Sequence, residues 1–395
     1  MMLGMRNSGR ILTESMIHAE EGERMKLENV QIGVIGAGGN SNAHLRQLVQ
    51  MKDECTVIGI TDIVRANAED KAQKYNIPIV FESAEELLQS DQVDAVVITV
   101  PNKFHAPLAV QALEAGKHVL LEKPMGINAD DAKRIVDALQ SRSQTMMIAH
   151  QLRWNWVPMQ VKEQVERGEL GNIYYAKTGI FRRKGIPGWG TWFTQKELSG
   201  GGPLIDIGVH MLDLTLHLMG DPKPISVYGS TYSELGPRKK GAANRRANWE
   251  GKFDVEDLAA ALIKMEDGST LNLEVSWAAH TDTDSNSFIH LMGTEGGAVI
   301  RGNYGKFLTE KFGELFETEL MPPENDEGAR ARICRHFLSC IREGKQPLTS
   351  AATGLRNNVI IDAIYESSRT GKEVKLDWNK WDAVQPIGLP VQEKI

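Results

Sequence analysis

The chain has 395 residues, of which 41% are hydrophobic and 25% charged, and this ordinary globular composition excludes disordered and collagen-like classes. At roughly 100–200 residues per domain, the length predicts two domains. The net charge is −7 at pH 7 and no long basic run occurs, which argues against nucleic acid or a membrane surface as a partner.

The sequence predicts a protein of a reducing compartment. Its three cysteines are sparse and odd in number, which argues against a disulfide framework. No apolar stretch approaches the ~18–20 residues of a membrane-spanning helix. The N-terminus shows neither the apolar core of a signal peptide nor a twin-arginine pair. We therefore expect a cytoplasmic location.

The first part of the chain predicts a Rossmann domain. Residues 1–28 are polar and weakly patterned, and we interpret them as an N-terminal extension that carries no chemistry. Short runs that are apolar on both faces, typical of strands in a parallel sheet, lie at 32–35, 56–60, 95–99, 118–121 and 146–149. Amphipathic helical segments alternate with them, at about 42–52, 64–75, 83–89, 105–116 and 129–141. This alternation predicts a doubly wound parallel sheet over residues 29–150.

A different pattern begins at residue 151. Segments of alternating polar and apolar residues indicate a large, mainly antiparallel open sheet, and they lie at about 173–181, 225–233, 256–265, 270–278 and 286–301. Helical patterns lie near 155–167, 204–219, 328–343 and 351–369. We expect a second α/β domain over 151–375 and a C-terminal tail over 376–395. The connection 234–254 is long enough to be either functional or disordered.

A glycine-rich turn joins the first predicted strand to the first helix. Its residues are Gly36-Ala-Gly38-Gly39-Asn40-Ser41, in which a serine replaces the third glycine of the dinucleotide-binding pattern. Such a turn lets backbone N–H groups and the helix N-terminus approach a pyrophosphate. Asp62 ends the second strand about twenty residues further on, where a carboxylate can bond both ribose hydroxyls. An ordinary strand–helix turn is the alternative, but together these features predict NAD in preference to NADP.

Polar residues also follow the fourth and fifth strands, at the sheet edge where ligands bind in such folds. The fourth strand ends in Thr99-Val-Pro-Asn102, which we expect to contact the ribose or nicotinamide. For His105, bonding to backbone is a slightly better interpretation than catalysis. The fifth strand ends in Glu122-Lys-Pro124, and the proline aims Lys123 at the same edge. An ammonium group there can bond a hydroxyl or ketone oxygen and lower the pKa of a neighbouring base.

The segment 200–219 predicts a buried helix with an ionisable stripe. Asp206, His210, Asp213 and His217 are spaced 4, 3 and 4 residues apart, so a continuous α-helix places them on one face. We interpret His210 as a general base, with Asp206 beside it to orient it or to bind substrate, and the other two as structural. The alternative is a structural Asp–His network of all four.

Aromatic and arginine side chains stand near these segments in the sequence. Indole rings pack well on the C–H faces of sugar rings, and arginine donates to hydroxyls or phosphate. We expect Trp189 and Trp192, which lie in a loop rich in glycine and proline, to contact substrate, and Arg153 to contact substrate or cofactor. Core packing is the alternative for the tryptophans, and we favour it for Trp154 or Trp156.

The sequence predicts no metal site. Cys334, His336 and Cys340 lie close together in the chain. On a helix, however, positions 334 and 336 point about 200° apart, so these three side chains cannot close a tetrahedral site unaided.

With these residues in view, the chain resembles the Gfo/Idh/MocA oxidoreductases, the family of glucose–fructose oxidoreductase and inositol dehydrogenase. The likeness covers roughly residues 28–375 and includes the glycine turn, Thr99-Val-Pro-Asn, Glu122-Lys-Pro, Gly168-Glu-Leu-Gly171 and the run Gly-Gly-Gly-Pro-Leu-Ile-Asp-Ile-Gly-Val-His that ends at His210. It implies a Rossmann domain followed by a substrate-binding α/β domain, whose open sheet is often buried in homodimers or homotetramers. It also places the family's catalytic lysine, aspartate and histidine on Lys123, Asp206 and His210.

Residues and resemblance together predict an NAD-dependent oxidoreductase that transfers a hydride between a secondary alcohol of a sugar, glycoside or cyclic polyol and the nicotinamide. The predicted cofactor contacts are Gly36, Gly38, Gly39, Asn40, Asp62, Thr99, Pro101, Asn102, His105, Glu122, Lys123 and Arg153. The predicted substrate contacts are Lys123, Arg153, Trp189, Trp192, Asp206 and His210. Two alternatives are an NAD-dependent glycosidase that acts through a transient keto-sugar and a non-catalytic dinucleotide-binding regulator. The intact set of Lys123, Asp206 and His210 argues against the regulator.

Overall fold

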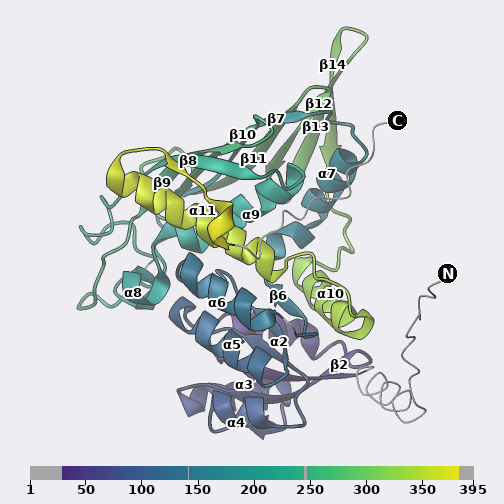
Figure 1. The fold of residues 1–395 in the computed structure, drawn as a ribbon, viewed down its shortest axis with the longest axis vertical. Helices are drawn as coiled ribbons and strands as arrows, with labels where there is room; N and C mark the ends of the chain where they lie inside the picture. The colour runs from purple at the N-terminus through teal and green to yellow at the C-terminus, as the bar shows by residue number, and fades with distance from the viewer. Residues whose placement is uncertain (1–28, 141, 244–246, 382–395) are drawn as a thin grey trace, which may run out of the picture.

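The computed structural model describes residues 29–140, 142–243 and 247–381, and the predicted N-terminal extension lies outside the described residues. The described chain builds two sheets, one of six strands and one of nine. Figure 1 shows the first in the lower, purple and blue part of the molecule and the second in the upper, teal and green part. The predicted α/β class is confirmed. No helix within these ranges combines the length and the apolar character that crossing a membrane requires.

The six-stranded sheet is parallel throughout, in the order β3-β2-β1-β4-β5-β6. Its strands are β1 (Val30–Ile35), β2 (Cys55–Thr61), β3 (Ile79–Val80), β4 (Ala95–Ile98), β5 (His118–Leu121) and β6 (Met146–Ile148). Five helices connect them, namely α2 (Ser41–Leu48), α3 (Arg65–Tyr75), α4 (Ala84–Gln89), α5 (His105–Glu114) and α6 (Ala129–Leu139). The order reverses between β1 and β4, which is the Rossmann topology with its ligand site at the carboxyl ends of those strands. The predicted Rossmann fold is confirmed, and only β3 is too short to leave a pattern in the sequence.

The nine-stranded sheet has the order β14-β13-β12-β11-β7-β10-β9-β8-β15 and is antiparallel except for the pair β7 and β10. Its strands are β7 (Ile173–Arg182), β8 (Pro224–Tyr232), β9 (Leu258–Met265), β10 (Thr270–Ser276), β11 (Ser285–Gly293), β12 (Gly296–Arg301), β13 (Tyr304–Lys311), β14 (Glu314–Leu320) and β15 (Val374–Lys375). One face carries the helices α7 (Trp156–Glu166), α9 (Val209–Leu218) and α11 (Ala351–Thr370) (Figure 1). The predicted mainly antiparallel sheet is confirmed.

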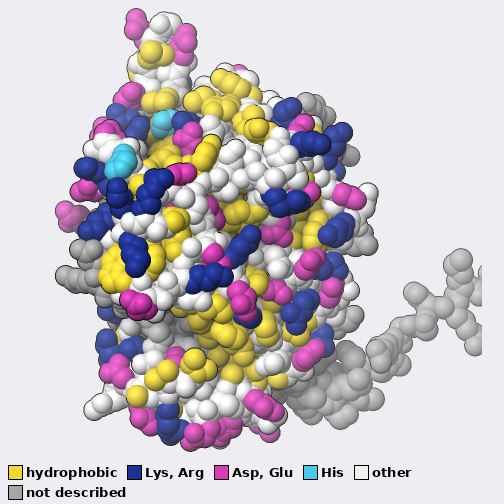
Figure 2. All heavy atoms as spheres, turned by 90° about the vertical axis from the view of Figure 1, so that its left-hand side faces the viewer, with side chains coloured by type: hydrophobic (Ala, Val, Ile, Leu, Met, Phe, Trp, Pro, Cys, Tyr) yellow, Lys and Arg dark blue, Asp and Glu magenta, His cyan; other side chains and the backbone are white. Residues whose placement is uncertain are grey.

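Two hairpins of this sheet differ from the prediction. The segment expected as one strand over 286–301 is the pair β11 and β12, which is interrupted at residues 294–295. The sequence does not predict the hairpin β13–β14, because β14 is exposed along almost its whole length and shows no alternation of burial. Figure 2 shows this hairpin projecting at the top of the molecule, with hydrophobic and acidic side chains at its end.

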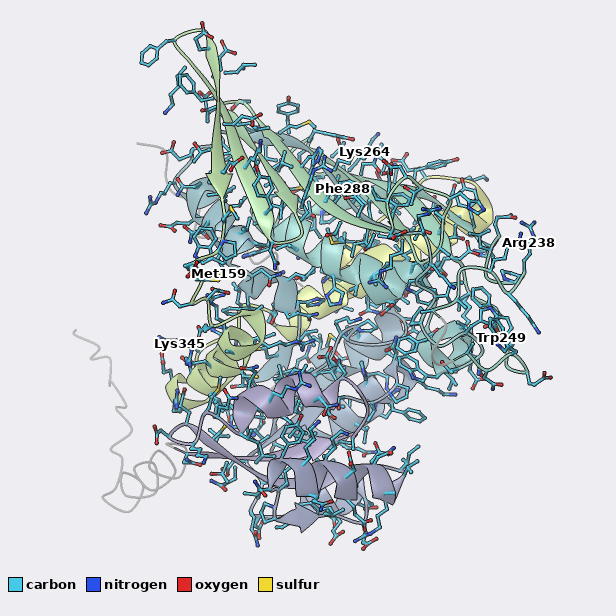
Figure 3. The ribbon with its side chains drawn as sticks, turned by 180° about the vertical axis from the view of Figure 1, so that it is seen from behind. Met159, Arg238, Trp249, Lys264, Phe288 and Lys345 are labelled. Carbon is cyan, nitrogen blue, oxygen red and sulfur yellow. The ribbon has the colours of Figure 1, made fainter. Side chains whose placement is uncertain are left out.

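The other face of the nine-stranded sheet is open. On β9, the buried Ile263 and Met265 alternate with the exposed Leu262 and Lys264. Figure 3 shows Lys264 and Phe288 on this sheet, on the side away from its helices. One face therefore packs on the core while the other meets solvent, which is the alternation that the sequence predicts.

Helix α10 (Ala329–Glu343) packs against α2 of the first domain, although it lies within the predicted second domain. Its buried Ile333, Phe337 and Leu338 belong to one hydrophobic cluster with Val30 and Ile60 of the Rossmann strands. The core of the first sheet is therefore completed by a helix from the far end of the chain. The packing crosses the boundary predicted at residue 150.

Candidate active site

The turn between β1 and α2 lets the backbone come close to a ligand. Gly36 has φ +97°, and a Cβ there would lie 2.7 Å from the carbonyl oxygen of Thr99, so the position requires glycine. A Cβ on Gly38 would meet no described atom within 4 Å, and Gly39 beside it is exposed. Asn40 makes no capping bond, and the first turn of α2 holds no acidic residue. The N–H groups that open α2 are therefore available to an anion such as a pyrophosphate.

Asp62 lies directly after β2 and beside this turn. Its Oδ2 accepts a 2.7 Å hydrogen bond from the N–H of Ala37, and its Oδ1 accepts a 2.8 Å bond from the N–H of Val64. A carboxylate offers about four lone-pair positions, so both oxygens keep room for a further donor. This placement fits the predicted contact with the ribose hydroxyls.

Two predicted cofactor contacts after β4 bind the protein's own backbone. The hydroxyl of Thr99 donates to the carbonyl of Gly36 at 2.8 Å, so it supports the glycine turn. The side-chain amide of Asn102 donates to the carbonyl of Ser199 at 2.8 Å, which ties the strand end to α8 (Lys196–Ser199). Pro101 lies between them, directly before a short 3-10 turn. The side chains of Thr99 and Asn102 therefore hold the backbone around the site in place.

His105 likewise binds backbone, which is the interpretation favoured from the sequence. Its Nδ1 and Nε2 lie 2.6 and 2.9 Å from the carbonyl oxygens of Pro124 and Val100. Burial lowers the pKa of His105, whereas the two carbonyl oxygens, which can only accept, act in the opposite direction and favour a proton on each ring nitrogen. The ring thereby joins the end of β4 to the segment that follows β5.

Lys123 and Asp206 come together from the two domains. The Nζ of Lys123 donates to Oδ1 of Asp206 at 3.0 Å and to its backbone carbonyl at 2.9 Å. The indole N–H of Trp277 donates to the second oxygen, Oδ2, at 3.0 Å. The lysine and aspartate side chains remain 14% and 17% exposed, so the pair is not sealed from solvent. Sequence reasoning missed Trp277, because a lone tryptophan after a strand carries no local sign of what it contacts.

The prediction of a continuous α-helix over 204–219 is wrong in its first turn. Residues Leu204–Gly208 form a π-helical turn, and α9 begins only at Val209. The carboxylate of Glu256 accepts the N–H groups of Gly202 and Leu204, at 2.9 and 3.0 Å, and so holds the chain as it enters this turn. The extra residue in a π turn shifts Asp206 relative to the residues on α9. Asp206 is therefore displaced from the predicted stripe, while His210, Asp213 and His217 remain on one face of α9.

Asp213 belongs to a sealed structural pair. Its carboxylate accepts hydrogen bonds from Nε and Nη2 of Arg153, both at 2.7 Å, and from the side-chain amide of Asn357 at 3.0 Å. The remaining Nη1 of Arg153 donates to the carbonyl of Leu348 at 3.2 Å. Arg153 is thus committed to the protein itself, contrary to the predicted contact with cofactor or substrate. His217, one turn further, lies 3.5 Å from Asp221.

His210 stands on the first turn of α9 with a neutral ring. Burial and then the nearby Lys123 and His150 lower the pKa of His210 well below its ordinary value. The ring of His150 lies edge to face at 6.5 Å between ring centres, and burial lowers the pKa of His150 to about 4. Within the described residues, Nδ1 of His210 has no hydrogen-bond partner. A neutral imidazole can accept a proton.

The two loop tryptophans occupy different environments. Trp189 is only 4% exposed, donates from Nε1 to the carbonyl of Gly236 at 2.8 Å and stacks on Phe253. It therefore anchors the connection 234–254, which corrects the predicted substrate contact. Trp192 is half-buried and stacks on Phe193 with ring centres 3.8 Å apart, so part of it remains accessible.

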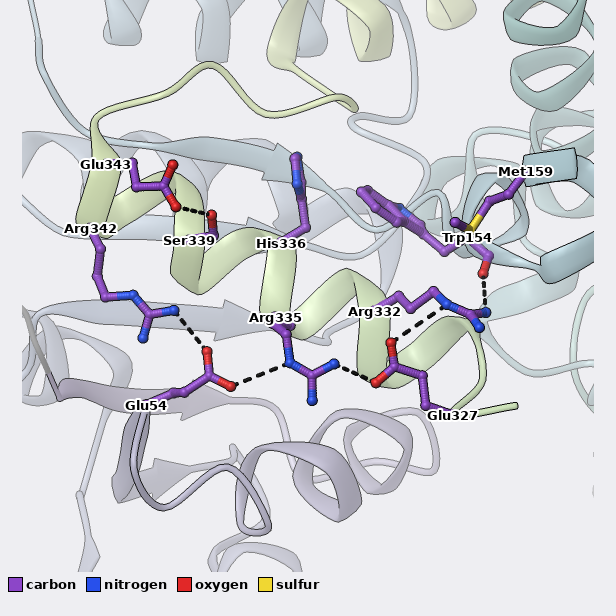
Figure 4. Close-up of a pocket in the computed structure, with 10 residues that line it drawn as sticks. All are labelled: Glu54, Trp154, Met159, Glu327, Arg332, Arg335, His336, Ser339, Arg342 and Glu343. Carbon is purple, nitrogen blue, oxygen red and sulfur yellow. Dashed lines mark hydrogen bonds and ion pairs between the residues drawn. The ribbon is translucent and has the colours of Figure 1, made fainter. Parts of the chain in front are cut away.

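The cysteine–histidine cluster on α10 binds the protein itself. His336 accepts from the N–H of Leu348 at 3.0 Å and lies 3.4 Å from the sulfur of Cys340. In the part of the chain that the structure describes, no three or more metal-ligating side chains gather. A pocket of about 410 Å³ lies on the same helix (Figure 4), and its lining contains none of the predicted site residues.

Known protein families match both parts of the chain. The family described as "Oxidoreductase family, NAD-binding Rossmann fold" matches residues 30–150, and "Oxidoreductase family, C-terminal alpha/beta domain" matches residues 162–376. The fold and the two family matches together thus define an NAD-binding oxidoreductase with two domains. The chain belongs to the Gfo/Idh/MocA family.

Several characterised proteins are similar to this chain over nearly their whole length. A D-glucoside 3-dehydrogenase of Escherichia coli strain K12 is 29% identical over 348 residues, which cover 88% of this chain and 97% of that protein. An NAD+-dependent scyllo-inositol 2-dehydrogenase of Bacillus subtilis strain 168 is 24% identical, with coverage of 88% and 96%. A solved levoglucosan dehydrogenase in complex with NADH has a TM-score of 0.80 at 22% identity and covers 88% of this chain and 99% of its own. This last likeness shows the fold alone.

Proposed function

We propose that the protein is an NAD-dependent dehydrogenase that transfers a hydride between a secondary alcohol of a sugar, glycoside or cyclic polyol and the nicotinamide. The observation that carries this proposal is the accessible contact between Lys123 and Asp206, with 3.0 Å between Nζ and Oδ1, one turn before the neutral His210. The names of similar proteins, D-glucoside 3-dehydrogenase and scyllo-inositol 2-dehydrogenase, support the substrate class.

The residues present fit NAD. The turn at Gly36 and Gly38 and the opening of α2 would hold the pyrophosphate, and Asp62 would hold the ribose hydroxyls. Buried Glu122 keeps its Oε2 without a partner among the described residues, which leaves an acceptor beside Lys123. When bound, NAD supplies the nicotinamide ring that takes up the hydride from the alcohol carbon.

His210 is the base in this proposal. An alcohol carbon gives up a hydride only as its hydroxyl proton leaves, so a base must lie within hydrogen-bond reach of that oxygen. The lowered pKa keeps His210 neutral near pH 7, so an imidazole nitrogen is open to the proton, although the same shift makes the ring a weaker base than a free imidazole. In the opposite direction the same nitrogen returns the proton.

Lys123 stabilises the charge that develops on the oxygen. An ammonium group has three donors, and Asp206 takes two of them through its carboxylate and its carbonyl. The third remains for the substrate oxygen, where the positive charge favours alkoxide character. Asp206, itself fixed by Trp277, therefore sets the direction of the donor that remains.

We also propose a homodimer or homotetramer in the cytoplasm. The open face of the large sheet exposes Tyr174, Tyr228 and Leu262 by 53%, 52% and 41%, and exposed apolar patches of this kind commonly form interfaces. The three cysteines are unpaired and buried, which suits a reducing compartment. Light scattering on the purified protein tests the assembly, and a monomer at working concentrations would refute it. Cell fractionation tests the location.

The proposed reaction is tested by mixing the protein with NAD and candidate sugars, glycosides and cyclic polyols while NADH absorbance is followed. We expect NADH to form with one of these classes and to be lost in Lys123→Ala. Release of aglycone from a glycoside without net NADH would support the glycosidase alternative. NAD binding without turnover on any class would support the regulator.

A further inference from the structure

Three polar groups meet behind the Lys123 segment, each from a different part of the chain. His44 lies on α2, Glu122 follows β5, and Arg330 lies on α10. Nε2 of His44 and Nη1 of Arg330 both contact Oε1 of Glu122, at 2.7 and 2.9 Å, and lie 3.2 Å from each other. The side chains of His44, Glu122 and Arg330 are 0%, 3% and 24% exposed. Two charged groups and an imidazole are therefore held together in a mostly dry environment.

The cluster of His44, Glu122 and Arg330 connects two parts of the NAD-binding domain, helix α2 after the glycine turn and the segment that carries Lys123. His44 belongs to the helix whose first turn faces the pyrophosphate position, and Glu122 immediately precedes Lys123. Arg330 comes from the helix that completes the core of the first sheet from the far end of the chain. A single guanidinium thus touches the helix after the glycine turn and the segment that carries Lys123.

We propose that Arg330 is a positioning residue for NAD, which anchors the Glu122 carboxylate against His44 and so fixes the Lys123 segment relative to α2. One carboxylate oxygen is held by His44 and Arg330, while Oε2 is buried without a partner among the described residues. The anchored carboxylate presents this oxygen to a hydrogen-bond donor of the bound dinucleotide. The inference rests on the proposed function only for the role of Lys123 in turnover, since NAD binding follows from the family.

The surroundings of Glu122 support a carboxylate that stays ionised. Burial raises the pKa of Glu122, but His44, Arg330 and Lys123 more than offset it and hold the pKa well below its ordinary range. Further titratable groups near it are Cys334 on α10 and the three histidines His105, His150 and His210. Of the cations, only Arg330 comes from outside the NAD-binding domain, so removing it weakens the anchor without touching the domain's own residues.

Arg335 offers a matched control on the same helix. It bridges Glu54, at 3.4 Å, and Glu327, and Figure 4 shows these contacts between α10 and the segment that carries Glu54. Like Arg330, it joins α10 to the first domain through a carboxylate. It touches no residue of the predicted cofactor site. Arg335→Gln therefore removes an interdomain ion pair while leaving Glu122 unchanged.

The test is NADH binding to the full-length protein, measured by fluorescence titration without any sugar. We expect Arg330→Gln to weaken NADH binding roughly tenfold or more, Arg330→Lys to recover part of the loss, and Arg335→Gln to bind within about twofold of the parent protein. Because Glu122 loses one of the neighbours that lower its pKa, the binding of Arg330→Gln should fall more than that of the parent protein as the pH is lowered. In the double variant Arg330→Gln, Glu122→Gln this additional fall should disappear.

Parent-like NADH binding by Arg330→Gln at all pH values would overturn the inference, whatever the turnover on sugars. Equal losses in Arg330→Gln and Arg335→Gln would also overturn it, because they would show a general loss of domain packing. Urea unfolding of each variant identifies misfolding. If Arg330→Gln does not fold, Arg330→Lys and Glu122→Gln carry the test, and parent-like binding by both would refute the proposal. Loss of sugar turnover with intact NADH binding would concern only the proposed function.

Discussion

Asp206 and Asp213 lie about two turns apart on one helical segment, and each pairs with a cation from another element. Asp206 and its partner Lys123 keep 17% and 14% of their side chains exposed. Asp213 and Arg153 are each 1% exposed and share two 2.7 Å bonds. A pair within reach of solvent can be approached by a substrate, whereas a sealed bidentate pair only holds elements together. Exposure and donor geometry therefore distinguish the reactive pair from the structural one, although both consist of an aspartate and a cation.

The largest effect is expected at the accessible pair and its base. His210→Ala should lower kcat by roughly 10²–10⁴ while NAD binding survives, because the proton acceptor is lost. Lys123→Ala should be at least as damaging, since it removes both a donor and a charge. Steady-state turnover on the true substrate and an NADH titration measure the two effects separately. Near-normal turnover in either variant would show that the proposed mechanism is wrong.

A substitution in the sealed pair of Asp213 and Arg153 should lower the free energy of unfolding and leave kcat nearly unchanged. Asp213→Asn leaves the buried Arg153 without its counter-charge, so the free energy of unfolding should fall by about 3–5 kcal/mol. Urea unfolding measures this loss, and kcat per folded molecule should change by less than about threefold. A stable variant with a large loss of kcat would reverse the distinction between the two pairs.

The pair of Asp213 and Arg153 also predicts how the stability of the protein changes as the pH is lowered. Burial raises the pKa of Asp213, but Arg153 and His150 lower it below that of an unfolded aspartate. A carboxyl group whose pKa is lower in the folded than in the unfolded protein adds to the free energy of unfolding. This contribution is complete above the pKa in the unfolded protein, about 3.9, and is lost as the pH falls through the pKa in the folded protein. The parent protein should therefore lose stability below about pH 4 more steeply than Asp213→Asn. Parallel pH curves for the two proteins would contradict this.

Trp277 tests how the accessible pair is oriented. Trp277→Phe removes the 3.0 Å bond to Asp206, and kcat should fall roughly tenfold with the KM for NAD unchanged within about twofold. Trp189→Phe is the matched control, because it also removes an indole bond inside the protein, from Nε1 to Gly236. The control should lose stability without losing kcat. Similar kinetic losses in both variants would indicate a general packing effect.

Asp62 extends the comparison to a carboxylate at the cofactor. It would bond the 2′-hydroxyl of NAD and repel the 2′-phosphate of NADP, so kcat/KM should favour NAD by more than about tenfold. Asp62→Ala should reduce this preference. Equal or better efficiency of the parent protein with NADP would refute the assignment.

The smallest effect is expected at the loop tryptophans. Trp192→Ala should raise the KM for the sugar by roughly three- to tenfold, and more than the KM for NAD, because an accessible indole packs on substrate. Trp189→Ala should instead lower the melting temperature, since Trp189 is part of a stacked cluster with Phe253. A selective loss of NAD affinity in Trp192→Ala would place this residue at the cofactor.

Local patterns in the sequence predict much of the fold. The run 95–99 is apolar on both faces, and β4 (Ala95–Ile98) is completely buried, so its place in a parallel sheet is readable from composition alone. The residues that follow such strands, including Lys123, must share one sheet edge. The contact between Lys123 and Asp206, however, is predicted only by the family resemblance. The spacing of residues within one segment says nothing of a partner in another domain.

The features that escaped prediction depend on distant contacts. A π turn at Leu204–Gly208 is held by Glu256, about fifty residues away, and the pattern of apolar residues gives no sign of the extra residue in that turn. Arg153 and Trp189 look like ligand contacts by type, yet Asp213 and Gly236 occupy their donors. Arg330 approaches Glu122 across more than two hundred residues, and such a pair leaves no mark on local composition.

The two margins of the nine-stranded sheet govern how copies of this chain can associate. One margin is β15, only two residues long, and the other is β14, which carries Glu314, Glu317 and Glu319. Unpaired backbone on a sheet margin invites strands of other molecules, and short length or like charges prevent this. Short length and like charges therefore oppose growth of the sheet from one molecule into the next, although β14 also exposes Leu315 and Phe316. The proposed homodimer or homotetramer would therefore use the broad face, where association ends in closed assemblies and not in fibres.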